Sequence, residues 1–413
     1  MTTAAAKKGG LFYGWVIVGA GLMVWTLEPG MYTSFGVFFK PISADMGWSR
    51  TTVSGAFTMA SLMLAVFSPI SGALADRYGP RRLVMASGVL VGTGYALLST
   101  TQALWQFYAF FLLVGMSMGI AFAPITSTVV RWFAENRGRA LGITSVGTGL
   151  GGMVFPPLSN YLIEIWGWRS TYLFFGILLG VLVVLSGSLL RRSPQEMGLL
   201  PYGVKETEHA ASVPAAQAGA EGYSLRQALA TGAFWRVFFS AMAFVFSFAM
   251  VQAHLVPHAT DRGLAPATAA LVMAVIGASN SVGRLGLGAL SDRVGRKRMM
   301  FVLLLTVSGA MLSLIWASQA WAFFLFAAIY GLAYGGAVVS WMGIQGDLFG
   351  LASAGAILGA TQTGTNTGGA SGPLLAGYVF DATQSYSLVF IVASLAPFIM
   401  SWLVLSLRRP RRG

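Results

Sequence analysis

Charged residues are scarce in this chain of 413 residues, and cysteine is absent. Asp, Glu, Lys and Arg together make up 9% of the sequence, against about 25% in a typical soluble domain. The absence of cysteine excludes disulfides and thiolate metal sites. Low charge, combined with 56% hydrophobic residues and a mean hydropathy of +0.71, indicates an integral membrane protein.

Three long stretches contain at most one Asp, Glu, Lys, Arg or His each: residues 83–130, 299–346 and 381–406. They are apolar on all sides, whereas the strands of a membrane β-barrel alternate polar and apolar residues. A helix that crosses a bilayer core of about 30 Å needs roughly 20 residues. The sequence therefore predicts an all-α membrane protein with about twelve transmembrane helices. We place these helices at residues 13–39, 51–75, 83–100, 104–130, 139–164, 169–190, 232–257, 265–291, 299–317, 320–345, 352–378 and 384–407.

The net charge of +13 is unevenly distributed along the chain. If the N-terminus is cytoplasmic, 20 of the 26 lysines and arginines fall in loops on that side, and only four fall in loops on the other side. The positive-inside rule then places both termini in the cytoplasm and the protein in the cell (inner) membrane. The basic charge reflects this topology, so no nucleic-acid partner is expected. The short polar start before the first span also predicts no signal peptide.

Two sequence motifs occur twice at nearly the same spacing. GALADRYGPRR at residues 72–82 recurs as GALSDRVGRKR at 288–298, an offset of 216 residues. LGITSVGTGLGG, from Leu141, recurs as LGATQTGTNTGG, from Leu358, at an offset of 217. These repeats predict two six-helix halves related by an axis along the membrane normal, with the substrate site between them at mid-depth. We expect an N-terminal bundle at 1–190, a cytoplasmic linker at 191–228 and a C-terminal bundle at 229–413.

The repeated loop after the second and the eighth predicted helix resembles the signature loop of the major facilitator superfamily, Gly-x-Leu-x-Asp-Arg-x-Gly-x-Arg-Arg. The resemblance implies the fold of that superfamily. The loop carboxylates can accept charge-assisted hydrogen bonds from arginines or helix N-termini of the other elements. We therefore expect these residues to gate the cytoplasmic side: Asp76, Arg77, Asp292 and Arg293.

Further motifs resemble one branch of that superfamily, the monocarboxylate transporters and the related oxalate:formate antiporters, and most of all the bacterial lactate and monocarboxylate transporters. They are YGWVIVGAG at 13–21, WFAENRGRALGITSVGTGLGG at 132–152, GLAYGG at 331–336 and GDLFG at 346–350. The resemblance implies transmembrane transport of a small monocarboxylate. No enzymatic activity, cofactor or metal ion is expected, because no nucleophile, metal cluster or phosphate-binding loop is visible.

Arg284 lies in the predicted helix at 265–291, eight residues before Asp292. Eight residues correspond to about 12 Å along a helix, and half of the hydrocarbon core is about 15 Å, so Arg284 lies near mid-depth. A cation there costs at least about 2.5 kcal/mol, and arginine cannot become neutral. It therefore needs an anion, and its planar fork suits a carboxylate. The equivalent position in the first half is Ser68, so the repeat is not symmetric in charge.

Two anions could neutralise the charge of Arg284. One is Glu28, in a permanent ion pair, and the other is the carboxylate of the substrate. The resemblance favours the substrate, because monocarboxylate transporters place such an arginine in the eighth helix. Asn280, one helical turn before Arg284, replaces an aspartate of many relatives and is expected to donate a hydrogen bond to the substrate. No Lys or Arg occurs between Met299 and Leu407, so a single fixed cation favours a monoanion such as lactate or pyruvate.

Aromatic side chains are the other candidates for the substrate site. Tyr330 and Tyr334 are four residues apart on the predicted tenth helix, where relatives use aromatic residues to bound the substrate. Tyr32 follows a helix break that Glu28-Pro29-Gly30 predicts. Phe122 stands where relatives often have tyrosine, which predicts a less polar pocket there. For each of these aromatic residues, packing without a ligand is the alternative role.

Proton symport requires a group that titrates during the cycle, and the lysine that relatives use in the first helix is missing here. His254 and Asp261, around the end of the predicted helix at 232–257, are the first candidates, because histidine titrates near neutrality. Glu28, deeper in the membrane, is the second. We thus expect a proton-coupled symporter of a small monocarboxylate with Arg284 as the anchor. The alternatives are an organic-anion exchanger of the oxalate:formate type and a membrane sensor that no longer transports.

Overall fold

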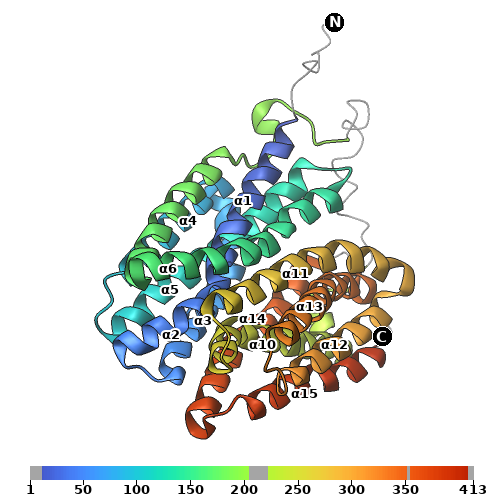
Figure 1. The fold of residues 1–413 in the computed structure, drawn as a ribbon. Coiled ribbons are helices and arrows are strands. Elements are labelled where there is room, and N and C mark those ends of the chain that lie inside the picture. Colours follow the sequence, from blue (N-terminus) through green and yellow to red (C-terminus); the bar gives the residue numbers. More distant parts are fainter. Residues whose placement is uncertain (1–11, 204–221, 351–353, 408–413) are drawn as a thin grey trace, which may run out of the picture.

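The computed structural model describes residues 12–203, 222–350 and 354–407 (Figure 1). Within these ranges the protein is helical apart from turns, short connections and two isolated β-bridges, as predicted. The helices are α1 (Tyr13–Thr33), α2 (Phe35–Met46), α3 (Arg50–Tyr78), α4 (Pro80–Leu98), α5 (Leu104–Trp132), α6 (Arg137–Leu189), η1 (Pro194–Met197), α9 (Leu225–Leu229), α10 (Gly232–Asp261), α11 (Pro266–Val294), α12 (Arg296–Ser313), α13 (Ala320–Phe349), α14 (Ala354–Thr383) and α15 (Ser387–Leu405).

Each predicted span coincides with one of these helices or with part of one. The first predicted span, 13–39, covers α1 and the start of α2. Helix α6 includes two predicted spans, and Gly167 separates them with a φ of 73° and a ψ of 167°. That conformation lies in the left-handed half of φ space, which glycine adopts without a steric penalty, so the chain reverses direction there.

Seven of the described helices are long and apolar enough to cross a membrane: α3, α5, α6, α10, α11, α13 and α15. Of the remaining long helices, α14 carries the polar residues Thr365 and Asn366, and α12 begins with three basic residues. These side chains lower the apolar content of a helix without changing its length. The protein is a multi-pass membrane protein of the fold class that the sequence predicts.

The helices form two groups, α1 to α6 (blue to green) and α10 to α15 (yellow to red), which lie side by side in Figure 1. Each group has its own hydrophobic core. One core is built almost entirely from residues 17–190 and the other almost entirely from residues 228–407. The domain boundaries at 190 and 229 stay a prediction that agrees with this arrangement.

The two groups meet at mid-length where α6 crosses α11. A Cβ atom on Gly277 would lie 2.5 Å from the carbonyl carbon of Gly152 and 2.7 Å from the carbonyl oxygen of Gly149, so only glycine permits this approach. A second contact joins α3 to α14, where the Thr58 hydroxyl donates to the carbonyl of Ala370 at 2.7 Å. The crossing holds α11 against the first half directly beside the turn that carries Asn280.

The predicted helix break at Glu28-Pro29-Gly30 is wrong. Helix α1 continues through Pro29 to Thr33, and α2 starts after the single residue Ser34. The hydroxyls of Thr33 and Ser34 donate to the carbonyl of Gly30 at 2.7 and 3.2 Å. These two hydroxyls donate to a carbonyl near the end of α1. The helix is therefore interrupted at Ser34 and not at the proline.

We expect Gly277→Val to destabilise the conformation described here, because its side chain has no room at the α6–α11 crossing. Overpacking of this kind costs about 1–3 kcal/mol. Gly286→Val is the matched control on the same helix, since nothing lies within 4 Å of a Cβ added at Gly286. Thermal unfolding of the purified variants in detergent measures the difference. Equal melting temperatures for the two variants would contradict the contact.

Candidate substrate-binding site

A cavity of about 230 Å³ lies between the two groups of helices, and we call it the arginine lobe. Seven helices contribute residues to it: α1, α3, α6, α10, α11, α13 and α14, with α6 giving only Thr148. The lining residues are Pro29, Tyr32, Thr33, Phe57, Ser61, Leu64, Thr148, Val245, Phe248, Ala249, Gln252, Asn280, Arg284, Tyr334, Thr365, Asn366 and Gly369. The cavity thus lies between the two halves, where the internal repeat predicts the substrate site.

Arg284 is the single cation in the lining of the arginine lobe. Its Nε donates a hydrogen bond to Oδ1 of Asn280 at 2.8 Å, one helical turn earlier on α11. Among the described residues, no carboxylate oxygen lies within 4 Å of the guanidinium, which differs from the alternative of a permanent ion pair with Glu28. The bond to Asn280 uses one of five N–H groups, so four N–H donors remain.

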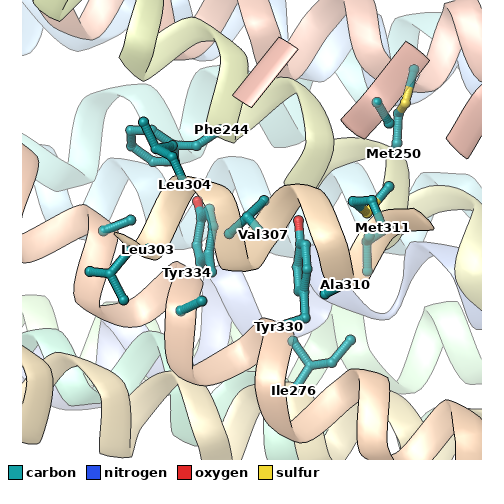
Figure 2. Packing of buried hydrophobic residues seen from close by; sticks show 14 of the residues in the cluster. Phe244, Met250, Ile276, Leu303, Leu304, Val307, Ala310, Met311, Tyr330 and Tyr334 are labelled. Atoms are coloured by element: carbon teal, nitrogen blue, oxygen red, sulfur yellow. The ribbon is translucent and has the colours of Figure 1, made fainter. Parts of the chain in front are cut away.

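The structure separates the two tyrosines of α13. Tyr334 lines the arginine lobe, and its ring is stacked on Phe248 with ring centroids 3.8 Å apart. Tyr330 is fully buried among Ile276, Met311 and neighbouring apolar side chains (Figure 2), and its hydroxyl has no hydrogen-bond partner among the described residues. Tyr330 therefore belongs to the core of the second half, outside the cavity.

Tyr32 also lines the arginine lobe, from α1 of the first half, whereas Arg284 lies on α11 of the second half. The hydroxyl of Tyr32 lies 2.8 Å from Oγ of Ser61, and its ring packs against Phe57. Phe122 lies elsewhere, in a second cavity described below, where its ring is stacked on Trp25. The structure thus brings four predicted site residues together in one cavity: Arg284, Asn280, Tyr334 and Tyr32.

The sequence reasoning did not single out several polar residues of the lining. Gln252 is buried on α10, and its Oε1 has no hydrogen-bond partner among the described residues. Thr365 and Asn366 lie on α14, within the repeated stretch LGATQTGTNTGG. The sequence feature that could have identified them is the high Thr and Asn content of this predicted membrane helix. Polar side chains in such helices face a cavity or another helix.

A second cavity of about 200 Å³ adjoins the first and contains Glu28; we call it the glutamate lobe. Pro29, Leu64 and Thr148 line both lobes, so the lobes meet at these residues. Glu28 is 3% exposed, and Oγ of Ser117 lies 2.9 Å from its Oε1. The other residues of this lobe are Val24, Trp25, Ser68, Met118, Ala121, Phe122 and Gln362.

His254 is buried at one end of the molecule and makes three polar contacts. Its Nε2 lies 2.9 Å from the carbonyl of Pro373 and 3.1 Å from Oγ of Ser54, and its Nδ1 lies 3.1 Å from the hydroxyl of Tyr386. A carbonyl oxygen can only accept, so Nε2 donates to Pro373 and Nδ1 accepts from Tyr386. His258 contacts the carbonyl of Leu314 instead.

Asp261 does not contact His254 directly but is linked to it through other side chains. Arg50 donates to the hydroxyl of Tyr386 and, at 2.7 Å, to Oδ2 of Asp261. Lys40 forms a second ion pair with Asp261 at 2.6 Å. We call these residues, with His254, the Asp261 network.

The Asp261 network joins the two groups of helices. Lys40 and Arg50 belong to α2 and α3, whereas Asp261 and Tyr386 belong to the second half. Asp381, at the end of α14, strengthens the junction by accepting from the backbone N–H groups of Arg50 and Thr51 at 3.2 and 2.8 Å. The structure therefore represents a conformation in which this end of the protein is closed.

The predicted gate at the other end is only partly described. The side chains of Asp76 and Asp292 lie outside the described residues. Arg77 and Arg293 are exposed. Among the described residues there is no group of three or more His, Asp or Glu side chains that could hold a metal ion.

The model of the Major Facilitator Superfamily matches residues 22–363 and, in a second match, residues 237–413. The chain belongs to the major facilitator superfamily. Its fold is similar to that of a bacterial homologue of the human lysosomal transporter Spinster, with a TM-score of 0.72, 16% identity and 96% coverage of both chains.

Two named relatives place this transporter more closely within the superfamily. The chain is 29% identical to monocarboxylate transporter 13 of Rattus norvegicus, over 92% of this chain and 86% of that protein. It is 24% identical to the oxalate:formate antiporter of Oxalobacter formigenes, over 93% and 89% of the two chains. The resemblance to these two families, predicted from the motifs, is confirmed.

The two tyrosines of α13 are expected to respond differently to removal of the hydroxyl. Tyr330→Phe removes a buried group without a partner, so the melting temperature of this superfamily member should stay the same or rise. Tyr334→Phe removes a hydroxyl at the cavity and should weaken the thermal stabilisation by lactate, the kind of substrate that the sequence predicts. A loss of ligand response in Tyr330→Phe with none in Tyr334→Phe would reverse the assignment.

Asp261→Asn is expected to loosen the closed end of the transporter. The ion pairs of Asp261 are partly exposed, and each such pair is worth about 0.2–1 kcal/mol, so the open population should rise several-fold. Because the chain has no cysteine, a single Thr33→Cys substitution in the cavity provides a unique label. Its reaction with an impermeant maleimide, added on the side of Asp261, should become several-fold faster.

Asp45→Asn is the control for this measurement. Asp45 pairs with Arg169, and both residues belong to the first half, so this pair does not hold the halves together. The hydrogen bond from Arg169 lowers the pKa of Asp45, which keeps it charged at neutral pH. Equal labelling rates for Asp261→Asn and Asp45→Asn would show that the Asp261 network does not control access.

Proposed function

We propose that the protein is a proton-coupled symporter of a small monocarboxylate, such as lactate or pyruvate, in the cell membrane. It works by alternating access, and the carboxylate of the substrate binds Arg284. The observation that carries this proposal is a guanidinium at the wall of a cavity between two membrane-embedded halves, with no protein carboxylate in contact among the described residues. A buried cation is stable only with a partner, and a substrate carboxylate supplies it.

The geometry around Arg284 suits a planar anion. Asn280 holds Nε and so fixes the plane of the guanidinium, while the terminal nitrogens remain to bind two carboxylate oxygens side by side. Asn280 therefore positions the arginine through its oxygen, and its amide N–H₂ group is left for the substrate. The hydroxyl of Tyr334 borders the same cavity as a further donor.

The charge and size of the cavity favour a small monoanion. Arg284 is the single cation among the described residues that line the two lobes, so a second carboxylate has no counter-charge. The arginine lobe, at about 230 Å³, is smaller than the roughly 300–1,000 Å³ of pockets that hold drug-sized ligands. The names of the monocarboxylate and oxalate:formate relatives point to the same chemical class of organic anion.

His254 and the Asp261 network are the proposed route by which a proton acts on the cycle. The Nδ1 of His254 accepts from Tyr386, whose oxygen accepts from Arg50. A proton on Nδ1 removes this acceptor and adds a positive charge to an environment that already contains Arg50, with Asp261 and Asp381 as the nearby anions. Protonation of His254 therefore weakens the closed end and promotes its opening. Glu28 is the second candidate, in the glutamate lobe.

Alternating access requires the closed end to open while the opposite end closes. The two halves touch at the α6–α11 crossing, at the α3–α14 contact and at the Asp261 network. When the halves separate at the Asp261 network and pivot about the α6–α11 crossing, Arg284 becomes accessible from the side of the membrane where Asp261 lies. At the opposite, cytoplasmic end, Asp76, Arg77, Asp292 and Arg293 are the proposed gate.

The transport mode is tested by uptake of labelled lactate into proteoliposomes. We expect an inward proton gradient to accelerate uptake, since the proton and the anion enter together. Uptake that ignores the gradient but depends on oxalate or lactate inside the vesicles would identify an exchanger instead. Binding of lactate without any flux would identify a sensor. Both results would overturn symport.

Arg284→Ala is expected to reduce lactate uptake to the level of empty vesicles. Arg284→Lys keeps the charge but loses the fork, and it should lower uptake by about tenfold or more, since hydrogen bonds to charged groups contribute about 1.5–3 kcal/mol. Arg236→Ala is the control, because Arg236 is bonded to the carbonyl of Ser406 away from both lobes. Uptake by Arg284→Ala at the rate of Arg236→Ala would exclude the anchor role.

A further inference from the structure

The two lobes adjoin each other and differ in chemistry. The arginine lobe is lined by Arg284, and the glutamate lobe is lined by Glu28. The lobes have similar volumes, about 230 and about 200 Å³, and they share Pro29, Leu64 and Thr148. A molecule the size of lactate, with six non-hydrogen atoms, needs only the arginine lobe, so the proposed function leaves the glutamate lobe with no part of the substrate to bind.

Glu28 lacks the partners that a buried carboxyl group requires. Among the described residues no cation lies within 4 Å of it, and its neighbouring donors are the hydroxyl of Ser87 and, at 2.9 Å, the hydroxyl of Ser117. That hydroxyl also lies 3.0 Å from the carbonyl of Ser87, and it has one hydrogen to share between the two acceptors. Glu28 therefore keeps unused acceptor capacity at 3% exposure. A hydrogen-bond donor from a ligand would fill it.

The walls of the glutamate lobe are mainly apolar. The rings of Trp25 and Phe122 are stacked with centroids 4.6 Å apart and an interplanar angle of 15°, and Met118 and Leu64 add apolar surface. The polar lining residues besides Glu28 are Ser68, Thr148 and Gln362. The indole Nε1 of Trp25 is buried without a partner among the described residues. The lobe thus offers a hydrocarbon-like surface for the body of a ligand, with a carboxyl acceptor beside it.

We infer that the glutamate lobe is a subsite for the tail of the substrate, and that the preferred substrate is a monocarboxylate with an apolar body and a terminal hydrogen-bond donor, a hydroxyl or an ammonium group. This inference rests on the proposed function, since it requires the carboxylate to bind Arg284. The terminal donor then contacts Glu28. A dicarboxylate is disfavoured, because its second carboxylate would meet the carboxyl group of Glu28 and not a cation.

The test is a competition assay in proteoliposomes that contain the wild-type protein, with labelled lactate as the reporter. The competitors are unbranched monocarboxylates of four to eight carbons, each as the plain acid, the ω-hydroxy acid, the ω-amino acid and the dicarboxylate. We expect one chain length at which an ω-hydroxy or ω-amino acid competes about tenfold better than the plain acid, the usual worth of a hydrogen bond to a charged group. The dicarboxylate of that length should compete worst.

The variant Glu28→Gln separates the two donors. Gln keeps a carbonyl acceptor but no charge, so a preference for the ω-amino acid should disappear, whereas a preference for the ω-hydroxy acid should persist in part. Glu28→Leu should remove both. Competition by each donor-tailed acid is expressed relative to competition by propionate, which is too short to reach Glu28, measured in the same variant. Glu164→Gln is the control, because Glu164 on α6 is bonded to Asn160 and lines neither lobe.

The outcomes distinguish the tail subsite from the anchor. If lactate uptake depends on Arg284 but no donor-tailed acid outcompetes its plain counterpart, the tail subsite is wrong and the proposed function stands. If Glu28→Gln abolishes the acceleration of propionate uptake by a proton gradient, Glu28 carries the proton, and its assignment to the tail is overturned. If lactate uptake is independent of Arg284, Arg284 does not anchor the carboxylate, and the inference of a tail subsite is overturned as well.

Discussion

The guanidinium of Arg284, fixed by Asn280 and without a carboxylate partner among the described residues, is the constraint on which the rest of the structure depends. A permanent charge near the middle of a membrane is costly, so the protein must either neutralise it or supply a polar cavity. Here the surrounding helices supply the cavity, and every other residue in its lining is uncharged. The stacked ring of Phe248 holds Tyr334 in place beside it. Under the proposed function, the carboxylate of the substrate binds this charge, whose position is fixed before binding.

The two halves pack closely against each other, but the ion pairs between them contribute little energy. The glycine crossing at Gly277 and Gly149 brings two backbones together, whereas the ion pairs of the Asp261 network are partly exposed. Exposed pairs contribute little, so the Asp261 network favours the closed conformation over the open one by only a small free energy. Alternating access needs such a balance, because substrate and proton can shift an equilibrium only by their differential affinity for the two states.

The helices, their number and the reversal near Gly167 follow from the sequence, because a bilayer demands about 20 apolar residues per span and charges accumulate in loops. The prediction failed where local chemistry depends on packing. Helix α1 continues through Pro29 to Thr33, and Tyr330 and Tyr334 are the same residue type on one helix but have different surroundings. Gln252 gave no pattern in the sequence, since a single polar residue does not reveal which face of its helix it occupies.

The sequence by itself determined that this is a helical membrane transporter with a duplicated architecture and an arginine that needs an anion. Composition, repeats and charge placement act along the chain, so they are legible without coordinates. The tertiary structure alone decided which residues share the cavity with Arg284, that His254 and Asp261 are linked through Tyr386 and Arg50, and that Glu28 lies in an adjoining lobe. These are distances between helices far apart in sequence, and no periodicity within one helix encodes them.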